Sequence, residues 1–110
     1  MDISLKQADG YDLLCITGRL DAATAGEGER QITELTANTS RLLVDMAGLE
    51  YISSAGLRVL LIVAKKMGQR GGRLALCALT PGVKEVFDIS GFSSIFKIFP
   101  TRPEGGAFLK

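Results

Sequence analysis

The sequence predicts an α/β fold in which a mixed sheet of four to five strands packs with about three to four helices. The elements follow one another as strand, strand, helix, and then strand and helix in alternation. The inner strands are almost continuously apolar, which is typical of a sheet covered on both faces. The chain has 110 residues, 46% of them hydrophobic, which suits one domain with one core. We therefore interpret residues 1–110 as a single domain, with its core over about 3–99 and a C-terminal tail over 100–110.

The N-terminal half begins with a hairpin. Residues 3–7 and 11–17 are expected to be strands joined by a tight turn at Asp9-Gly10. Gly18 ends the second strand, and Asp21 can cap a helix that runs to about residue 37. The residues of this helix expected to face inward are Ala25, Ile32 and Leu35.

The chain then enters a short buried strand over residues 41–46, followed by a loop that reaches Ile52. Asp45 lies at the end of this strand. We interpret its carboxylate as an acceptor for loop amides, with direct chemistry as the alternative.

The C-terminal half alternates helix and strand. A helix from Ser54 to about residue 70 ends at Gly71-Gly72, and residues 73–78 form the next strand. Thr80-Pro81 is a strong start for a second helix, with Val83, Val86 and Phe87 facing inward. Gly91 stops this helix, residues 95–99 form the last strand, and residues 101–110 are assigned no structure.

The helix that begins at Ser54 has an apolar face and a polar face at about 100° per residue. Its sheet-facing residues are expected to be Leu57, Leu60, Leu61, Ala64 and Met67. The opposite, solvated face carries Ser54, Arg58, Lys65 and Gln69. Three apolar residues also fall on the polar side: Ala55, Val59 and Ile62. They indicate either a docking patch beside Ser54 or a helix that is buried more widely than the wheel suggests.

Two adjacent serines stand at the start of this helix. Ser53 is expected to be the N-cap, because its hydroxyl can accept a hydrogen bond from the first turn. Ser54 then takes the first helical position, where a phosphate would meet unpaired N–H groups and the positive end of the helix dipole. Gly56 is expected to leave the neighbouring backbone open to a partner. From the spacing alone, a simple cap is the favoured interpretation of the two serines.

Several function classes are disfavoured by composition. Lys and Arg number 13 against 12 Asp and Glu, which gives no basic excess for nucleic acid. No apolar run approaches membrane-spanning length and the N-terminus has no signal-peptide pattern, so we expect a cytoplasmic protein. Cys15 and Cys77 are interpreted as reduced core residues rather than as a disulfide or metal site. Histidine is absent, which removes Ser-His and Cys-His pairs, and we expect no catalytic residue, metal or cofactor.

Residues 45–57, Asp45-Met46-Ala47-Gly48-Leu49-Glu50-Tyr51-Ile52-Ser53-Ser54-Ala55-Gly56-Leu57, resemble the signature of STAS domains. This family includes anti-sigma factor antagonists and cytoplasmic domains of sulphate transporters. Two weaker motifs are also similar, Gly18-Arg19-Leu20-Asp21-Ala22-Ala23-Thr24 and Ile89-Ser90-Gly91-Phe92. The resemblance covers about residues 3–99. This chain has Ser53 where many antagonists have Asp, and Ala55 where they have a second Ser or Thr.

The resemblance implies a phosphorylation switch. Ser54 matches the serine that a partner kinase phosphorylates in the antagonists, and Asp21 would line the surface beside it, in place of its role as a cap. The unphosphorylated chain would bind an anti-sigma factor that is also a serine kinase, and a phosphatase would reset it. The expected partner-binding residues are Asp21, Ser53, Ser54, Ala55, Gly56, Arg58, Val59 and Ile62.

Two other functions compete with this switch. STAS-like proteins also serve as constitutive subunits of transporters or signalling scaffolds, which would use the same helix face permanently. A nucleotide-binding enzyme is disfavoured, because the chain has no Gly-rich Walker sequence with its lysine.

Overall fold

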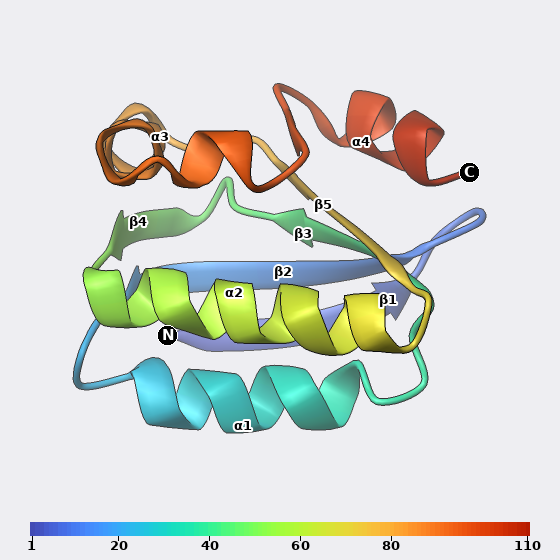
Figure 1. Ribbon diagram of the computed structural model, residues 1–110, viewed down its shortest axis with the longest axis horizontal. Coiled ribbons are helices and arrows are strands. Elements are labelled where there is room, and N and C mark those ends of the chain that lie inside the picture. The colour runs from blue at the N-terminus through green and yellow to red at the C-terminus, as the bar shows by residue number, and fades with distance from the viewer.

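The computed structural model describes all residues 1–110 and contains a mixed sheet with helices on both faces (Figure 1). The strands are β1 (Asp2–Gln7), β2 (Asp12–Leu20), β3 (Arg41–Asp45), β4 (Leu49–Ile52), β5 (Arg73–Cys77) and β6 (Ile98–Phe99). The helices are α1 (Ala25–Leu35), α2 (Ser54–Gln69), α3 (Pro81–Ser90), the short 3₁₀ helix η1 (Phe92–Ser94) and α4 (Arg102–Leu109). The predicted fold class is confirmed.

The sheet has the order β1-β2-β3-β5-β6, and β4 pairs with the far end of β2. Only β1 is antiparallel to its neighbour; the other pairings are parallel. Figure 1 shows α1 and α2 on one side of the sheet and α3 and α4 on the other. No helix in the structure is long and apolar enough to cross a membrane.

Alternation along β3 places successive side chains on opposite faces of the sheet. Leu42 and Val44 of β3 belong to the larger apolar cluster, which includes residues of α1 and α2. Leu43, between them, joins a smaller cluster that is closed by Leu109 of α4. Parallel strands covered on both faces must be apolar at successive positions, which explains their unbroken apolar runs.

β4 is not predicted from the sequence, where residues 49–52 are interpreted as loop. Gly18 is expected to end β2, but the strand continues to Leu20 through an irregularity in register at Gly18. The extension offers a partner to residues 49–52, and Leu49 and Ile52 become buried there. The sequence signal is weak because this strand is only four residues long.

α1 is shorter than predicted and faces partly outward. It begins at Ala25, because Asp21 organises a preceding turn in which its C=O accepts the N–H groups of Thr24 and Ala25. Ile32 is fully buried as expected, but Leu35 is 40% exposed, so its predicted inward position is wrong.

The structure of the C-terminal residues also differs from the prediction. Residues 95–97 of the predicted strand form a turn and a bend that follow η1, which leaves only the two-residue β6. Residues 102–109, assigned no structure from the sequence, form α4. The Thr101 hydroxyl accepts the N–H of Glu104 at 3.4 Å and donates to the Glu104 carboxylate at 3.1 Å, so Thr101 is the N-cap of this helix.

Candidate functional site

The start of α2 is tied to the end of β2. Ser53 has extended backbone angles, and its Oγ accepts the N–H of Gly56 at 3.3 Å, as an N-cap does. Its own N–H donates to the C=O of Leu20 at 3.0 Å. The predicted cap is therefore confirmed, and it also joins α2 to the sheet.

Ser54 is exposed, and its hydroxyl makes no hydrogen bond within the chain. The N–H of Leu57 donates to the C=O of Ser53, and that of Gly56 donates to the cap. The N–H groups of Ser54 and Ala55 have no backbone acceptor, as expected in the first turn of a helix. The Ser54 hydroxyl thus stands free beside unpaired donors at the positive end of the α2 dipole.

Gly56 does not have the role expected from the sequence. It is buried, and a Cβ built on it would lie 2.4 Å from the C=O of Leu20 and 2.8 Å from Cγ1 of Ile52. The missing side chain therefore lets α2 approach β2 closely, rather than leaving the backbone open to a partner.

Val59 is also placed differently. It is only 3% exposed, because α1 packs beside α2. Ala55 and Ile62 remain partly exposed, and Arg58 is exposed. The helix is thus buried more widely than the wheel suggests, although part of the apolar strip still reaches the surface.

A shallow groove of about 180 Å³ separates the two helices at this surface. Its lining comes from α2, through Ala55, Arg58, Val59 and Ile62, and from α1, through Ala25, Gly26 and Glu29. None of the α1 residues is among the partner-binding residues expected from the sequence, because no local pattern shows that α1 runs beside α2. We call this surface the α1–α2 groove.

Asp21 adjoins this region, because Leu20 bonds to Ser53. Its Oδ1 accepts the N–H groups of Ala23 at 3.0 Å and Thr24 at 3.2 Å. Partial burial alone would raise the pKa of Asp21, but hydrogen bonds from the backbone of Thr24 and Ala23 outweigh it and hold the pKa below its usual value. Asp21 therefore caps the turn before α1 instead of α1 itself.

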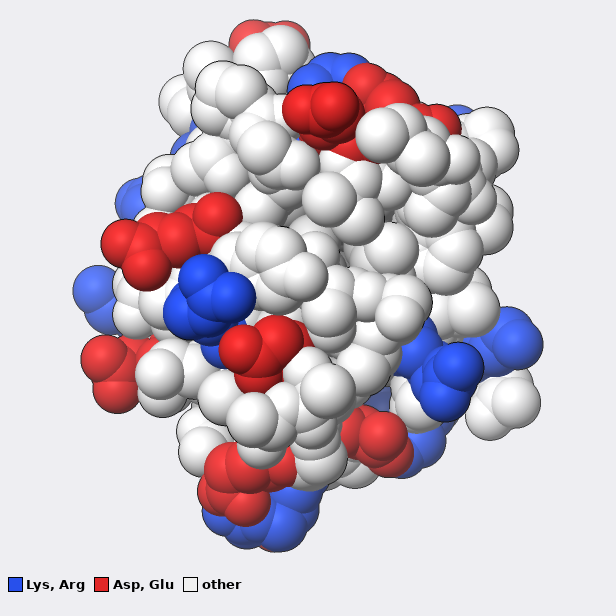
Figure 2. Space-filling model, turned by 90° about the vertical axis from the view of Figure 1, so that its left-hand side faces the viewer, with Lys and Arg blue, Asp and Glu red and all other residues white.

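Arg19 and Tyr51 lie on the paired ends of β2 and β4, and sequence reasoning missed both. The Arg19 guanidinium lies 4.4 Å from the Tyr51 ring centroid, a cation–π contact. Arg19 also pairs with Asp21 at 3.5 Å. Tyr51 is 41% exposed, and the available signal in the sequence was an aromatic residue two positions before the cap. Figure 2, which views this end of the molecule, shows uncharged surface bordered by charges of both signs.

Asp45 ties down its loop as predicted, since Oδ1 accepts the N–H of Ala47 at 3.0 Å. Its Oδ2 pairs with Arg102 of α4 at 2.9 Å. Both cysteines are free thiols; Cys77 is buried in the core, whereas Cys15 is only half-buried beside it. Burial raises the pKa of the Cys77 thiol to about 11, which keeps it protonated at neutral pH.

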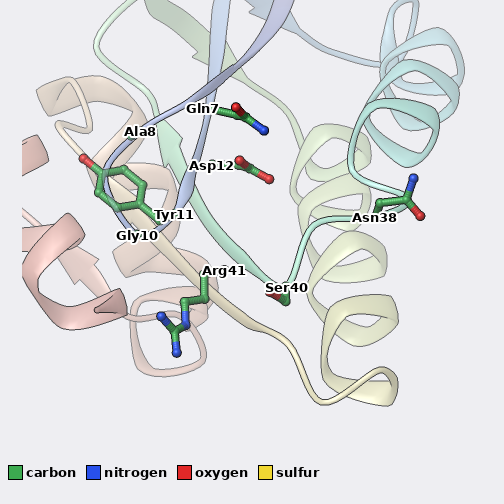
Figure 3. Close-up of a pocket in the computed structure, with 8 residues that line it drawn as sticks. All are labelled: Gln7, Ala8, Gly10, Tyr11, Asp12, Asn38, Ser40 and Arg41. Atoms are coloured by element: carbon green, nitrogen blue, oxygen red, sulfur yellow. The ribbon is translucent and has the colours of Figure 1, made fainter.

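The opposite end of the sheet has a hollow of about 360 Å³ beside the β1–β2 hairpin. Figure 3 shows Gln7 and Asp12 next to each other, with the guanidinium of Arg41 pointing away from them. Asp12 accepts a hydrogen bond from the hydroxyl of Thr39 at 2.9 Å. The polar groups of this hollow thus do not converge on one point. No group of three Cys, Asp or Glu residues is arranged to hold a metal ion.

Comparison with known proteins identifies the family. The STAS domain profile matches residues 2–105. BtrV of Bordetella bronchiseptica, which is named as an anti-sigma factor antagonist, is 40% identical over 111 residues, which cover 100% of this chain and 96% of BtrV.

Solved structures share the fold at lower identity. An anti-sigma factor antagonist from Mycobacterium paratuberculosis has a TM-score of 0.88 at 23% identity, covering 98% of this chain and 92% of that protein. The Bacillus cell fate determinant SpoIIAA in its phosphorylated form has a TM-score of 0.71 at 17% identity, covering 99% of this chain and 100% of SpoIIAA.

Proposed function

Because the chain belongs to the STAS domain family, we propose that it is an anti-sigma factor antagonist, a non-enzymatic binding module that acts in the cytoplasm. The unphosphorylated protein binds an anti-sigma factor that is also a serine kinase, and this frees a sigma factor for transcription. Phosphorylation of Ser54 by that kinase releases the complex, and a serine phosphatase resets the chain. The name of BtrV, 40% identical over the whole chain, supports this proposal.

One observation supports Ser54 as the phosphorylated residue. The Ser54 hydroxyl is exposed and unbonded, so a kinase can reach it without breaking a native hydrogen bond. The neighbouring Ser53 is occupied as the cap, which makes it the poorer target. A phosphate on Ser54 can accept the free N–H groups of the first helical turn.

The proposed partner surface is the exposed part of the predicted set. Ser54, Ala55, Arg58 and Ile62 belong to it, with Asp21 and Ser53 beside them. Gly56 and Val59 support this surface from below, because both are buried. The α1–α2 groove adds Ala25, Gly26 and Glu29.

Phosphorylation changes the charge of this surface more than its shape. A phosphate adds about 1.5 to 2 negative charges, which must be desolvated when a partner covers it. A penalty of about 2.7 kcal/mol already weakens binding roughly a hundredfold. Arg58 lies one helical turn from Ser54 and can pair with the phosphate in the free protein.

Affinity capture from the native cell extract tests the proposal, with the wild type, Ser54→Ala and Ser54→Asp as baits. We expect a protein with a serine-kinase domain on the first two baits, and roughly a hundredfold weaker binding to Ser54→Asp when the purified partner is titrated. Incubation of the captured kinase with ATP should phosphorylate the wild type at Ser54, as read by mass spectrometry.

Ser40→Asp is the matched control. Ser40 is an exposed serine beside the hairpin hollow, and its hydroxyl makes no hydrogen bond within the chain. This variant should bind the partner as the wild type does. If Ser54→Asp and the wild type retain the same transporter or scaffold component with equal affinity, the chain is a constitutive subunit and Ser54 has no switching role.

A further inference from the structure

β1 forms one edge of the sheet, and its outer side has no neighbouring strand. The strand is six residues long and alternates exposed with half-buried side chains over Asp2–Leu5. Unpaired edge strands offer a row of free N–H and C=O groups to any compatible strand. The residues of β1 therefore decide what this edge can pair with.

The pairing with β2 shows which backbone groups of β1 are free. The N–H of Ala8 donates to the C=O of Tyr11 at 2.8 Å, so this pair is hydrogen-bonded. Bonded and non-bonded pairs alternate along an antiparallel ladder, which makes the even-numbered residues of β1 the bonded ones. The N–H and C=O groups of Ile3, Leu5 and Gln7 consequently point away from β2, toward the free edge.

This edge is complementary to itself in one register. If a second copy lies antiparallel with Ser4 facing Ser4, then Ile3 of each copy faces Leu5 of the other. These residues direct their backbone groups outward, so each such pair can exchange two N–H···O bonds.

The same register places Asp2 of each copy opposite Lys6 of the other. These are non-bonded positions, where facing side chains approach most closely. Both side chains are exposed, and neither takes part in an ion pair within its own chain.

Neighbouring registers lack this match. Centring the pairing on Ile3 puts Asp2 opposite Ser4, and centring it on Leu5 puts Lys6 opposite Ser4. Centring the pairing between two residues would place a residue whose backbone groups are free opposite one whose backbone groups are already bonded to β2. The hydrogen-bond phase therefore excludes the registers centred between two residues, and the charge match then selects the register centred on Ser4 among those that remain.

We propose that this chain forms a symmetric dimer in which β1 pairs with β1 of a second copy about a two-fold axis at Ser4, which continues the sheet across both copies. Ile3 and Leu5 are half-buried against the core of their own copy, so the pairing also covers the rest of their apolar surface. None of the residues proposed for the Ser54 switch lies on β1, so this proposal stands independently of that function.

Disulfide trapping tests the register. Ser4→Cys should cross-link two copies under mild oxidation, because facing residues at a non-bonded position have the separation that a disulfide needs. The variant is made together with Cys15→Ala, since Ser4 also faces Cys15 within the chain.

Asp2→Cys and Lys6→Cys in the same background are the matched controls. In the proposed register, each of these positions is four residues from its own counterpart, roughly 13 Å, which is too far for a disulfide. We expect dimers on non-reducing gels from Ser4→Cys alone. Equal cross-linking of all three variants, or none from Ser4→Cys, would overturn the register.

Sedimentation equilibrium tests the charges. Wild type should dimerise with increasing concentration, and Lys6→Asp should weaken the dimer about tenfold or more, because like charges then face each other at two symmetric positions. Adding Asp2→Lys to Lys6→Asp exchanges the charges and should restore affinity to within about threefold of wild type.

Lys65→Asp reverses an exposed, unpaired charge on α2 and should leave dimerisation unchanged. Circular dichroism checks that every variant is folded. A wild type that stays monomeric to about 1 mM, or a dimer indifferent to Lys6→Asp, is incompatible with the proposal.

Discussion

Three residues at the start of α2 have separate tasks that the sequence presents as one motif. The Ser53 hydroxyl is used as the cap, whereas the Ser54 hydroxyl has no partner in the chain. Gly56 lets the helix reach the C=O of Leu20. This division leaves one serine available for modification while its neighbours hold the helix in place.

Gly56→Ala is expected to lower the free energy of unfolding by about 2 kcal/mol or more, because the added Cβ would clash with backbone that also anchors Ser53. Urea denaturation measures the change. Gly68→Ala is the control in the same helix, since a Cβ added there would meet nothing within 4 Å. That variant should be stabilised by up to about 1 kcal/mol through helix propensity. Equal effects at both positions would contradict the close approach of α2 to β2.

Among the elements, α4 is the one that sequence reasoning missed most completely. Leu109 is fully buried and completes the smaller apolar cluster. Arg102 pairs with Asp45, which holds the start of the helix near the end of β3. Gly105 approaches so closely that a Cβ would lie 2.6 Å from Cδ1 of Leu43. A glycine that argues against a helix locally therefore lets α4 pack closely on β3.

Leu109→Ala should destabilise the protein by about 2 to 4 kcal/mol, since it leaves a cavity under α4. The matched control is Leu35→Ala, because Leu35 ends α1 with 40% of its surface exposed. That change should cost less than about 1 kcal/mol. Thermal or urea unfolding of the two variants gives the comparison. Similar losses at both positions would mean that α4 does not seal the core.

Across the whole molecule, the proposed switch and the stability of the fold are separable. Ser54 projects from one end of the sheet, and the core clusters do not include it. A charge added at Ser54 would therefore break no side-chain hydrogen bond and no core contact. We therefore expect phosphorylation to change the charge of the proposed partner surface while the structure is kept.

Ser54→Asp should change the free energy of unfolding by less than about 1 kcal/mol, with the change in the stabilising direction, because an acidic side chain suits a helix N-terminus. The free energy of unfolding is measured by urea denaturation at low ionic strength, where salt screens the interaction with the helix dipole least. Ser40→Asp, away from any helix start, should show no such gain. A loss above about 2 kcal/mol for Ser54→Asp would mean that reduced partner binding reflects unfolding rather than charge.

Local sequence signals were sufficient to predict those helices whose first residues are fixed by a cap or a proline. The cap at Ser53 and the Thr80-Pro81 start of α3 place two helices correctly, because caps act within one turn. Thr80 nevertheless directs its hydroxyl to the C=O of Leu49 rather than to its own helix. Unbroken apolar runs identified β2, β3 and β5 as covered on both faces.

Long-range contacts decided the rest, because their energy comes from partners distant in the chain. β4 exists because β2 extends to Leu20, and Val59 is buried because α1 lies beside α2. α4 forms because Leu109 packs against one face of the sheet, on side chains of β2, β3 and β5 that no local pattern brings together. The sequence by itself thus determined the serine that stands free at the start of α2, and only the tertiary structure decided which residues surround it.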